Sequence, residues 1–287
     1  GRAIINQNTS SLFVDGRYTF QAKKQIDIDM ISLLHWNDFS EELKKNLKKN
    51  KCVALDPMLH SIEEVNKIIE LADENETKLY FTKPNLIDEL WIDKPEREYS
   101  VIFNHPINYA GIDASNKVDQ FVKELKSNNL DSYFLSSLDS IAWLLNIRAD
   151  DILHTPLAFS YLFISVENKP ILYLSIEKLN TDLKNRLSNF LNLQPIEEIE
   201  NIFENLTKKL KVGFDYKNTS YFFYDLALGY DLVPSNLQNP CLIPKATKNE
   251  TELEGSRKAH LRDGVSITKF LYWLKNHQSV EDENEIS

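Results

Sequence analysis

The sequence is poor in cysteine, in glycine and in long apolar runs. Only two cysteines, Cys52 and Cys241, occur in 287 residues, too few for a disulfide framework or a thiolate metal cluster. Seven glycines are far fewer than the usual ~7% would give. No GxGxxG or GxxxxGKS/T pattern occurs, so the glycine-rich loops that bind nucleotide phosphates are missing. These shortages exclude a disulfide-rich scaffold and argue against nucleotide chemistry.

Basic residues are outnumbered, because 33 lysines and arginines stand against 43 aspartates and glutamates, for a net charge of -10. An acidic surface repels phosphate backbones, so we expect no nucleic-acid partner. No run approaches the roughly 18 apolar residues that cross a bilayer, and no basic-then-apolar leader is visible, so we expect no membrane partner and no signal peptide. A reduced, cytoplasmic setting fits best. The chain starts at Gly1 without a methionine, and we expect the natural N-terminus to lie upstream.

What is present is an alternation of short apolar runs and amphipathic segments, which is typical of an α/β fold. A β-hairpin is predicted over Ala3–Val14, followed by a helix over Tyr18–Lys24. A second hairpin is predicted over Phe159–Ser175, again ahead of a helix, Asn180–Leu191. We interpret this as a weak internal repeat, two α/β domains built to one plan. The alternative is a coincidence between two common hairpins.

The rest of the chain predicts further helices and strands. Ser61 and Glu64 form a capping box at the start of one helix. Pro240 and Pro244 bracket an extended connector, and the charged segment Asp93–Glu98 predicts a domain boundary. The expected strands are Cys52–Leu55, Leu79–Phe81, Asp131–Leu135 and Lys211–Phe214. The expected helices are Ser40–Lys51, Ser61–Glu74, Lys117–Ser127, Ser140–Ile147, Ile199–Lys209, Ser220–Gly229 and Asn249–Lys275.

Several strings are more specific than generic α/β sequence. They are Phe13–Ala22, Asn85–Trp91, Leu138–Arg148, Asp151–Pro156, Pro240–Ala246 and Lys248–Asp263. In order and spacing they resemble the long form of Xaa-Pro aminopeptidase (aminopeptidase P), in the creatinase/methionine-aminopeptidase superfamily. The resemblance runs over essentially the whole chain.

The resemblance implies three domains. Residues 1–96 are expected to be the remainder of a first creatinase-like domain, and residues 97–239 a second one. Both are expected to contain mixed sheets flanked by helices. Residues 240–287 are expected to be the linker and first helix of a truncated pita-bread catalytic domain.

The resemblance also implies an activity for the complete protein. Family members remove the N-terminal residue that precedes proline, and they form homodimers. They use two divalent metal ions, usually manganese, held by two Asp, one His and two Glu. That ligand set is absent here, and the closing Glu283–Ser287 resembles a family segment that normally leads onward. We therefore expect a fragment with no catalytic residue, no metal ligand and no cofactor of its own, and no activity alone.

Two alternatives remain at this point. The chain could be a naturally truncated, catalytically inactive interaction or dimerisation module that acts through a partner peptidase chain. It could instead belong to another superfamily activity such as creatine amidinohydrolysis, although the strings at Leu138–Arg148 and Pro240–Ala246 argue against this.

Arg17 is the one residue that we assign to substrate binding. The resemblance implies that the arginine of the segment Asp15–Tyr18 reaches toward the active site and contacts the peptide substrate. A guanidinium suits this role because it presents a planar fork of donors to carboxylates or carbonyls. Asp15, Gly16 and Tyr18 are expected to form its scaffold, with Gly16 permitting a tight turn. The alternative is that Arg17 pairs with Asp15 or Asp27 on the surface.

The other candidate side chains are given structural roles. The six histidines show no paired metal-ligand spacing. His260 and Asp263 could touch one ion but fit an ordinary polar helix face. His154 is expected to bind backbone or a carboxylate near a turn. Trp143 is expected in the core or a dimer interface, and Cys52 in the core.

Overall fold

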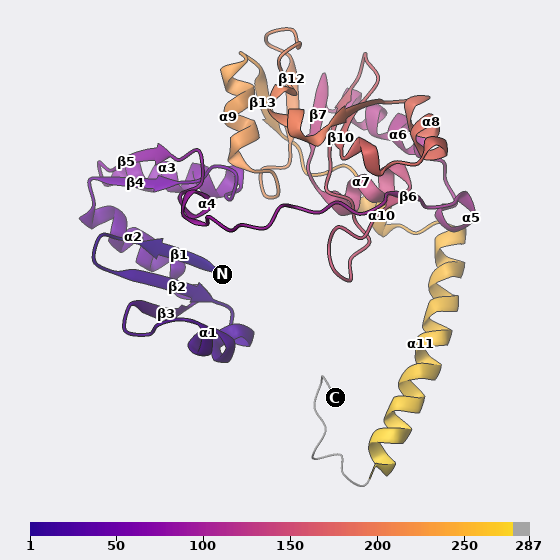
Figure 1. Cartoon of the computed structure of the whole chain (residues 1–287). Coiled ribbons are helices and arrows are strands. Elements are labelled where there is room, and N and C mark those ends of the chain that lie inside the picture. The colour runs from indigo at the N-terminus through magenta and orange to yellow at the C-terminus, as the bar shows by residue number, and fades with distance from the viewer. Residues whose placement is uncertain (278–287) are drawn as a thin grey trace. The chain divides into compact units, whose positions relative to one another are not determined.

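A computed structural model describes residues 1–277 (Figure 1). The expectations for Glu283–Ser287 lie outside the described residues. The chain divides into two compact units. Unit 1 comprises Gly1–Pro95 with Ser220–Phe222, and unit 2 comprises Glu96–Thr219 with the chain from Phe223 onward.

Unit 1 is a small α/β unit with two sheets. Strand β1 (Arg2–Ile5) pairs antiparallel with β2 (Ser10–Val14), as predicted, and β2 pairs parallel with β3 (Ile31–His35). Strands β4 (Cys52–Leu55) and β5 (Lys78–Phe81) form a second, parallel pair. The helices are α1 (Thr19–Gln25), α2 (Phe39–Lys49), α3 (Ile62–Glu74) and α4 (Leu86–Leu90).

Helix α3 forms where local sequence and packing agree. The Ser61 hydroxyl accepts a bond from the Glu64 backbone N–H, and the Glu64 carboxylate accepts one from the Ser61 N–H, at 3.3 and 3.4 Å. This is the predicted capping box. Val65, Ile68 and Ala72 share one face and are buried, which is the spacing of an amphipathic helix.

Unit 2 is built on a six-stranded mixed sheet in the order β11-β10-β9-β7-β12-β13. These strands are β7 (Ser132–Leu135), β9 (Tyr161–Ser165), β10 (Ile171–Leu174), β11 (Asn192–Pro195), β12 (Lys211–Phe214) and β13 (Val233–Asn236). The longer helices of this region are α6 (Ala114–Ser127), α7 (Leu138–Leu145), α8 (Thr181–Ser188) and α9 (Tyr221–Gly229). The short elements are β6 (Phe103–Asn104), β8 (Ile147–Arg148), α5 (Ile107–Ala110) and α10 (Leu242–Ala246).

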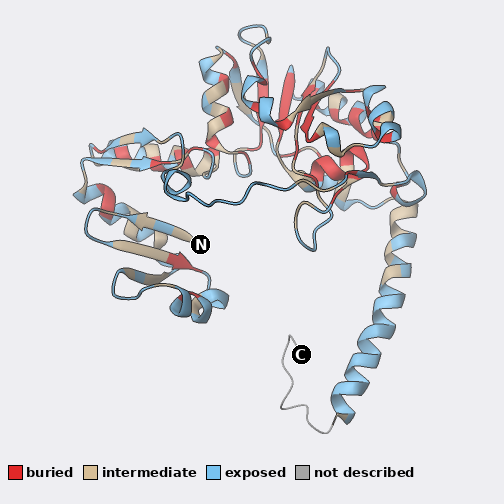
Figure 2. Ribbon diagram, viewed as in Figure 1, coloured by how far each residue is buried: buried red, intermediate tan, exposed pale blue. Residues whose placement is uncertain are grey.

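The central strand β7 is covered on both faces of the sheet. All four of its residues are buried, and buried residues are red in Figure 2. Along β7, Tyr133 and Leu135 face one core with side chains from α6, α7 and α8. The intervening Phe134 faces an aromatic cluster on the other side, which contains Tyr161, Phe203, Phe214 and Phe223. A strand buried on both faces reads as a continuous apolar run, which is why this segment could be predicted from sequence.

The same order of elements occurs in both units. Each has an antiparallel hairpin (β1–β2 or β9–β10), a helix, and a strand parallel to the second hairpin strand. Each then has a parallel strand–helix–strand pair, β4–α3–β5 or β12–α9–β13. The topology supports the internal repeat inferred from the two hairpins.

Three expectations about local structure were wrong. Instead of a helix over Ile199–Lys209, a 3₁₀-helix spans Ile196–Asn201, and Ile196, Ile199 and Ile202 are buried at the three-residue spacing of that helix. The connector at Leu242–Ala246 is the helix α10, because Pro244 lies in its first turn, where no backbone N–H is needed. Cys52 is exposed, because β4 has only one buried face.

Helix α11 (Glu250–Asn276) begins beside α5 and has no buried residue (Figures 1 and 2). The predicted helix is confirmed, and Asn249 and Glu252 form a second capping box. Within residues 1–277, no helix combines the length and the apolar character that a membrane crossing needs.

Candidate functional site

Arg17 lies at the carboxyl edge of the parallel strands β2 and β3. These strands end together, with Val14 opposite His35. A 3₁₀-turn over Gly16–Tyr18 follows β2, and another over Trp36–Asp38 follows β3. Ligands of open α/β sheets commonly bind at this edge, beyond the carboxyl ends of the strands. The position therefore suits a binding residue.

The Arg17 side chain is held by Asp15 through three contacts. The Asp15 carboxylate accepts bonds from the Arg17 backbone N–H at 3.0 Å, from Nε at 2.9 Å and from Nη2 at 3.4 Å. The hydrogen bond from the Arg17 side chain lowers the pKa of Asp15, and the same bond raises the pKa of Arg17. The Arg17 side chain remains 80% exposed. Asp15 thus orients a guanidinium that stays open to solvent.

The surroundings of Arg17 are partly as expected. The guanidinium lies 5.9 Å from the centre of the Tyr18 ring. Gly16 does not need glycine's conformational freedom, because its φ is not positive and a Cβ there would meet only His35 Nε2 at 3.9 Å. The tight turn is made by the Asp15 cap instead. Arg17 pairs with Asp15 and not with Asp27.

The other sequence candidates are placed apart. In the described part of the chain, no three His, Cys, Asp or Glu side chains come together as a metal site. His260 Nδ1 lies 2.9 Å from the Ser256 carbonyl oxygen and Asp263 contacts Arg262, which is the ordinary polar helix face. His154 has a φ of 61° in the turn closed by the bridge between Ile152 and Thr155. The described residues therefore do not supply the ligands of a metal pair.

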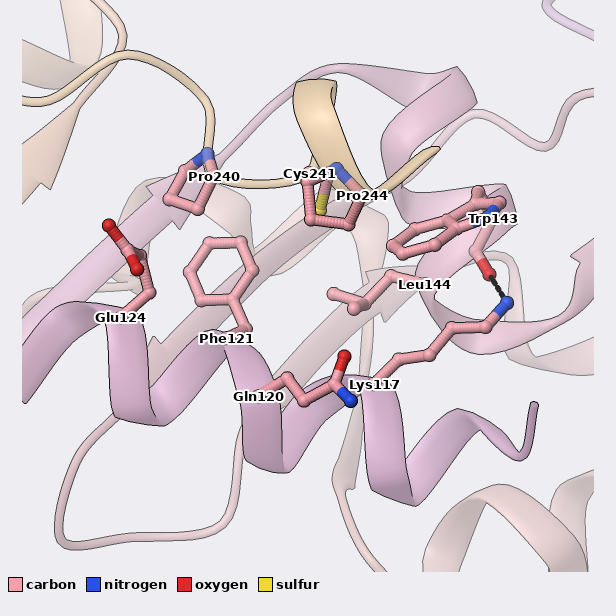
Figure 3. Close-up of a pocket in the computed structure, with 9 residues that line it drawn as sticks. All are labelled: Lys117, Gln120, Phe121, Glu124, Trp143, Leu144, Pro240, Cys241 and Pro244. Atoms are coloured by element: carbon pink, nitrogen blue, oxygen red, sulfur yellow. Dashed lines mark hydrogen bonds between the residues drawn. The ribbon is translucent and has the colours of Figure 1, made fainter. Parts of the chain in front are cut away.

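Unit 2 contains a cavity of about 180 Å³ between α6, α7 and the segment before α10 (Figure 3). Lys117 Nζ donates to the Trp143 carbonyl at 2.8 Å and to Asn146 Oδ1 at 2.9 Å, and it lies 4.3 Å from the Trp143 ring centre. Burial lowers the pKa of Lys117 to about 8. Across the cavity, burial raises the pKa of the Cys241 thiol to about 12. The cavity thus contains a restrained amine and an unreactive thiol.

Trp143 is half-buried and belongs to the interior of unit 2. Its indole Nε1 donates to Glu252 Oε1 at 3.2 Å, across to α11. This contact needs an indole N–H, which accounts for a tryptophan at this position of α7. The alternative that Trp143 lies in a dimer interface stays a prediction.

Comparison with known proteins decides the family. Residues 93–252 match the creatinase/prolidase N-terminal domain. The chain belongs to this family. Curated relatives named probable Xaa-Pro aminopeptidase P are 32% identical in Talaromyces stipitatus and 33% identical in Penicillium rubens. Both alignments cover 96% of this chain but only 44% and 47% of the relatives.

A solved structure gives the same result for the fold of this creatinase/prolidase-type chain. It is the X-prolyl aminopeptidase from Caenorhabditis elegans, described as a cytosolic enzyme with a di-nuclear active site. It matches with a TM-score of 0.85 and 26% identity, over 95% of this chain and 46% of that one. The resemblance to Xaa-Pro aminopeptidase and the α/β fold are confirmed. The chain spans less than half the length of the relatives it matches.

Sequence reasoning missed Lys117 in this creatinase/prolidase-type fold. It is only 2% exposed, among the apolar residues of α6. Its spacing in the sequence could have indicated this burial. Lys117 stands four residues before Phe121, on the same helix face as Ala114 and Leu125. A lysine on the apolar face of a helix needs acceptors, and these come from Trp143 and Asn146, which are distant in sequence.

Proposed function

We propose that this chain forms the non-catalytic first and middle domains of a metal-dependent Xaa-Pro aminopeptidase. The complete protein would remove the N-terminal residue that precedes proline from peptides. The observation that carries the proposal is the match to X-prolyl aminopeptidase over 95% of the chain. Residues 1–96 and 97–239 are proposed as the two creatinase-like domains, and residues 240–287 as the start of a third, catalytic domain.

The side chains of α11 support the assignment of a third domain. Large apolar residues are exposed all around its second half. At 100° per residue, Leu261 and Val265 lie on one side, and Ile267, Phe270 and Leu274 lie on the opposite side. A helix that is apolar on opposite sides is characteristic of the interior of a larger fold. The proposed catalytic domain would cover both sides.

Arg17 is proposed to contact the peptide substrate in the complete enzyme. Its exposed guanidinium, oriented by Asp15 at a sheet edge, supports this role. The divalent metal ions, proposed to be manganese, would be bound by Asp, His and Glu residues of the catalytic domain. We further propose a homodimer in the cytoplasm.

The test compares residues 1–287 with the product of the complete reading frame. Both are assayed for release of the first residue from Xaa-Pro peptides, with and without added Mn²⁺. We expect metal-dependent release by the complete product only. Release by residues 1–287 alone would show that this chain is catalytic, and no release by an intact complete product would overturn the aminopeptidase proposal.

The apolar sides of α11 also favour a second candidate, an interaction module that acts through a partner peptidase chain. A reading frame that stops soon after Ser287, together with co-purification of a separate peptidase chain on α11, would support this candidate against the first.

A further inference from the structure

The two capping residues of α11, Asn249 and Glu252, also attach the helix to the rest of unit 2. Asn249 Oδ1 accepts from the Glu252 N–H, and Glu252 Oε2 accepts from the Asn249 N–H, both at 3.0 Å. The remaining polar atoms bond outward. Asn249 Nδ2 donates to the carbonyl of Ala110, the last residue of α5, at 2.9 Å. Glu252 Oε1 accepts from the Trp143 indole of α7 at 3.2 Å.

These bonds belong to a closed hydrogen-bonded ring. From Trp143 the ring continues through its carbonyl to Lys117 Nζ, and from Lys117 to Asn146 Oδ1, at 2.8 and 2.9 Å. Asn146 Nδ2 then donates to the Ile112 carbonyl at 2.9 Å. Ile112 lies two residues after Ala110, where the ring meets Asn249 again. The ring therefore connects α5, α6, α7 and α11.

The chemistry of position 249 is more specific than helix capping requires. Asp, Ser and Asn cap helices about equally well, because each offers an oxygen to the backbone N–H groups. Asp has no donor, and Ser has a single oxygen for both tasks, whereas the Asn amide accepts through Oδ1 and donates to the Ala110 carbonyl through a separate Nδ2. One side chain thus caps the start of α11 and satisfies the end of α5. A rotation of α11 about its first turn would therefore break either the bond to Ala110 or the cap itself.

We propose that Asn249 and Trp143 are positioning residues that hold α11 at one fixed angle to the rest of unit 2. This inference rests on the proposed function. It means that the catalytic domain packed on α11 is held in a single orientation relative to the rest of unit 2. The geometry follows from four bonds made by two capping side chains, of which two are within α11 and two are to other helices.

The test measures the distance between α6 and α11 in residues 1–287, without any peptide substrate or activity assay. Spin labels are placed at Lys123→Cys on α6 and Lys269→Cys on α11, both exposed, in a Cys52→Ser background. We expect one narrow distance distribution by pulsed electron paramagnetic resonance. Asn249→Asp keeps the cap and loses the bond to Ala110. Trp143→Phe keeps an aromatic side chain and loses the indole donor to Glu252. Each variant is expected to broaden the distribution and to remove the single peak.

Trp273→Phe on α11 is the matched control, because the partners on which Trp273 stacks within residues 1–277 are Phe270 of its own helix and His277. This variant should leave the peak unchanged. Circular dichroism confirms that each variant is folded. Two results would overturn the proposal. One is a broad distance distribution in the labelled protein that keeps Asn249 and Trp143, and the other is a narrow distribution in both folded variants. Either result leaves the aminopeptidase assay untouched, so the two proposals fail separately.

Discussion

Gly111 and Asn249 approach each other so closely that no side chain fits between them. A Cβ on Gly111 would lie 2.4 Å from Asn249 Oδ1, and the backbone of Gly111 has a φ of 72°. Both observations require glycine at the end of α5. The contact places the start of α11 directly on the last turn of α5.

Gly111→Ala should therefore destabilise the protein. The left-handed backbone alone costs about 1–2 kcal/mol for an L-residue, and the collision with Asn249 adds to it. We expect a lower free energy of unfolding in urea. Gly264→Ala is the control, because nothing lies within 4 Å of a Cβ at this helical position. That variant should be stabilised by about 0.5–1 kcal/mol, and equal stability of the two variants would contradict the prediction.

Local patterns predicted much of the fold. The capping box at Ser61 predicted the start of α3, and the helix predicted from Asn249 onward is present as α11. The alternation and length of apolar runs predicted the hairpin strands and β7, because these signals depend on residues that are neighbours in the chain. Strands β3, β11 and β13 were missed by the sequence analysis. Each is an edge strand, which pairs with one neighbouring strand.

Non-local features could not be predicted. The ring around Lys117 joins residues that are more than a hundred positions apart, and nothing in the sequence near Lys117 identifies Trp143 or Asn146 as acceptors. The assignment of Arg17 depended on the family motif. The sequence around it predicts only the pair with Asp15 that the structure contains, and substrate contact stays a prediction.

The aromatic cluster around Phe134 should dominate the stability of unit 2. Phe134 is fully buried, and its ring centre lies 4.3 Å from that of Phe223 and 5.9 Å from that of Phe214. Phe134→Ala should lower the free energy of unfolding by about 3–5 kcal/mol, through lost burial and the cavity that remains. Leu153→Ala, at an exposed position, should change it by less than about 0.5 kcal/mol. Similar values for both in urea denaturation would contradict the role of the cluster.

Lys117 should give the protein a pH-dependent stability in the alkaline range. Burial lowers its pKa from 10.5 to about 8. Between these pH values the unfolded chain still holds the proton that the folded chain has released, so the free energy of unfolding rises with pH. Below about pH 8 both states are protonated and the contribution is constant.

The measurement compares wild type with Lys117→Met by urea denaturation below, within and above this pH window. The variant also loses two hydrogen bonds, but that loss adds an offset and no slope. The stability difference should shift in favour of the wild type as the pH rises through the window. A difference that stays flat would mean that Lys117 keeps its ordinary pKa.

Arg17→Ala should lower kcat/KM of the complete enzyme for Xaa-Pro peptides and leave its fold intact. The guanidinium is exposed and its ion pair with Asp15 lies at the surface, where such pairs contribute little to stability. The unfolding midpoint of residues 1–287 should therefore not change. Asp15→Asn should give a smaller loss of activity, because the amide still offers one acceptor to the arginine but no negative charge.

Lys24→Ala, which removes a neighbouring exposed cation of α1, separates a specific contact from a general effect of charge. It should leave kcat/KM unchanged. Equal losses for Arg17→Ala and Lys24→Ala would indicate electrostatic attraction of the peptide rather than contact. An unchanged kcat/KM for Arg17→Ala would leave Arg17 as a surface partner of Asp15 and remove it from the substrate site.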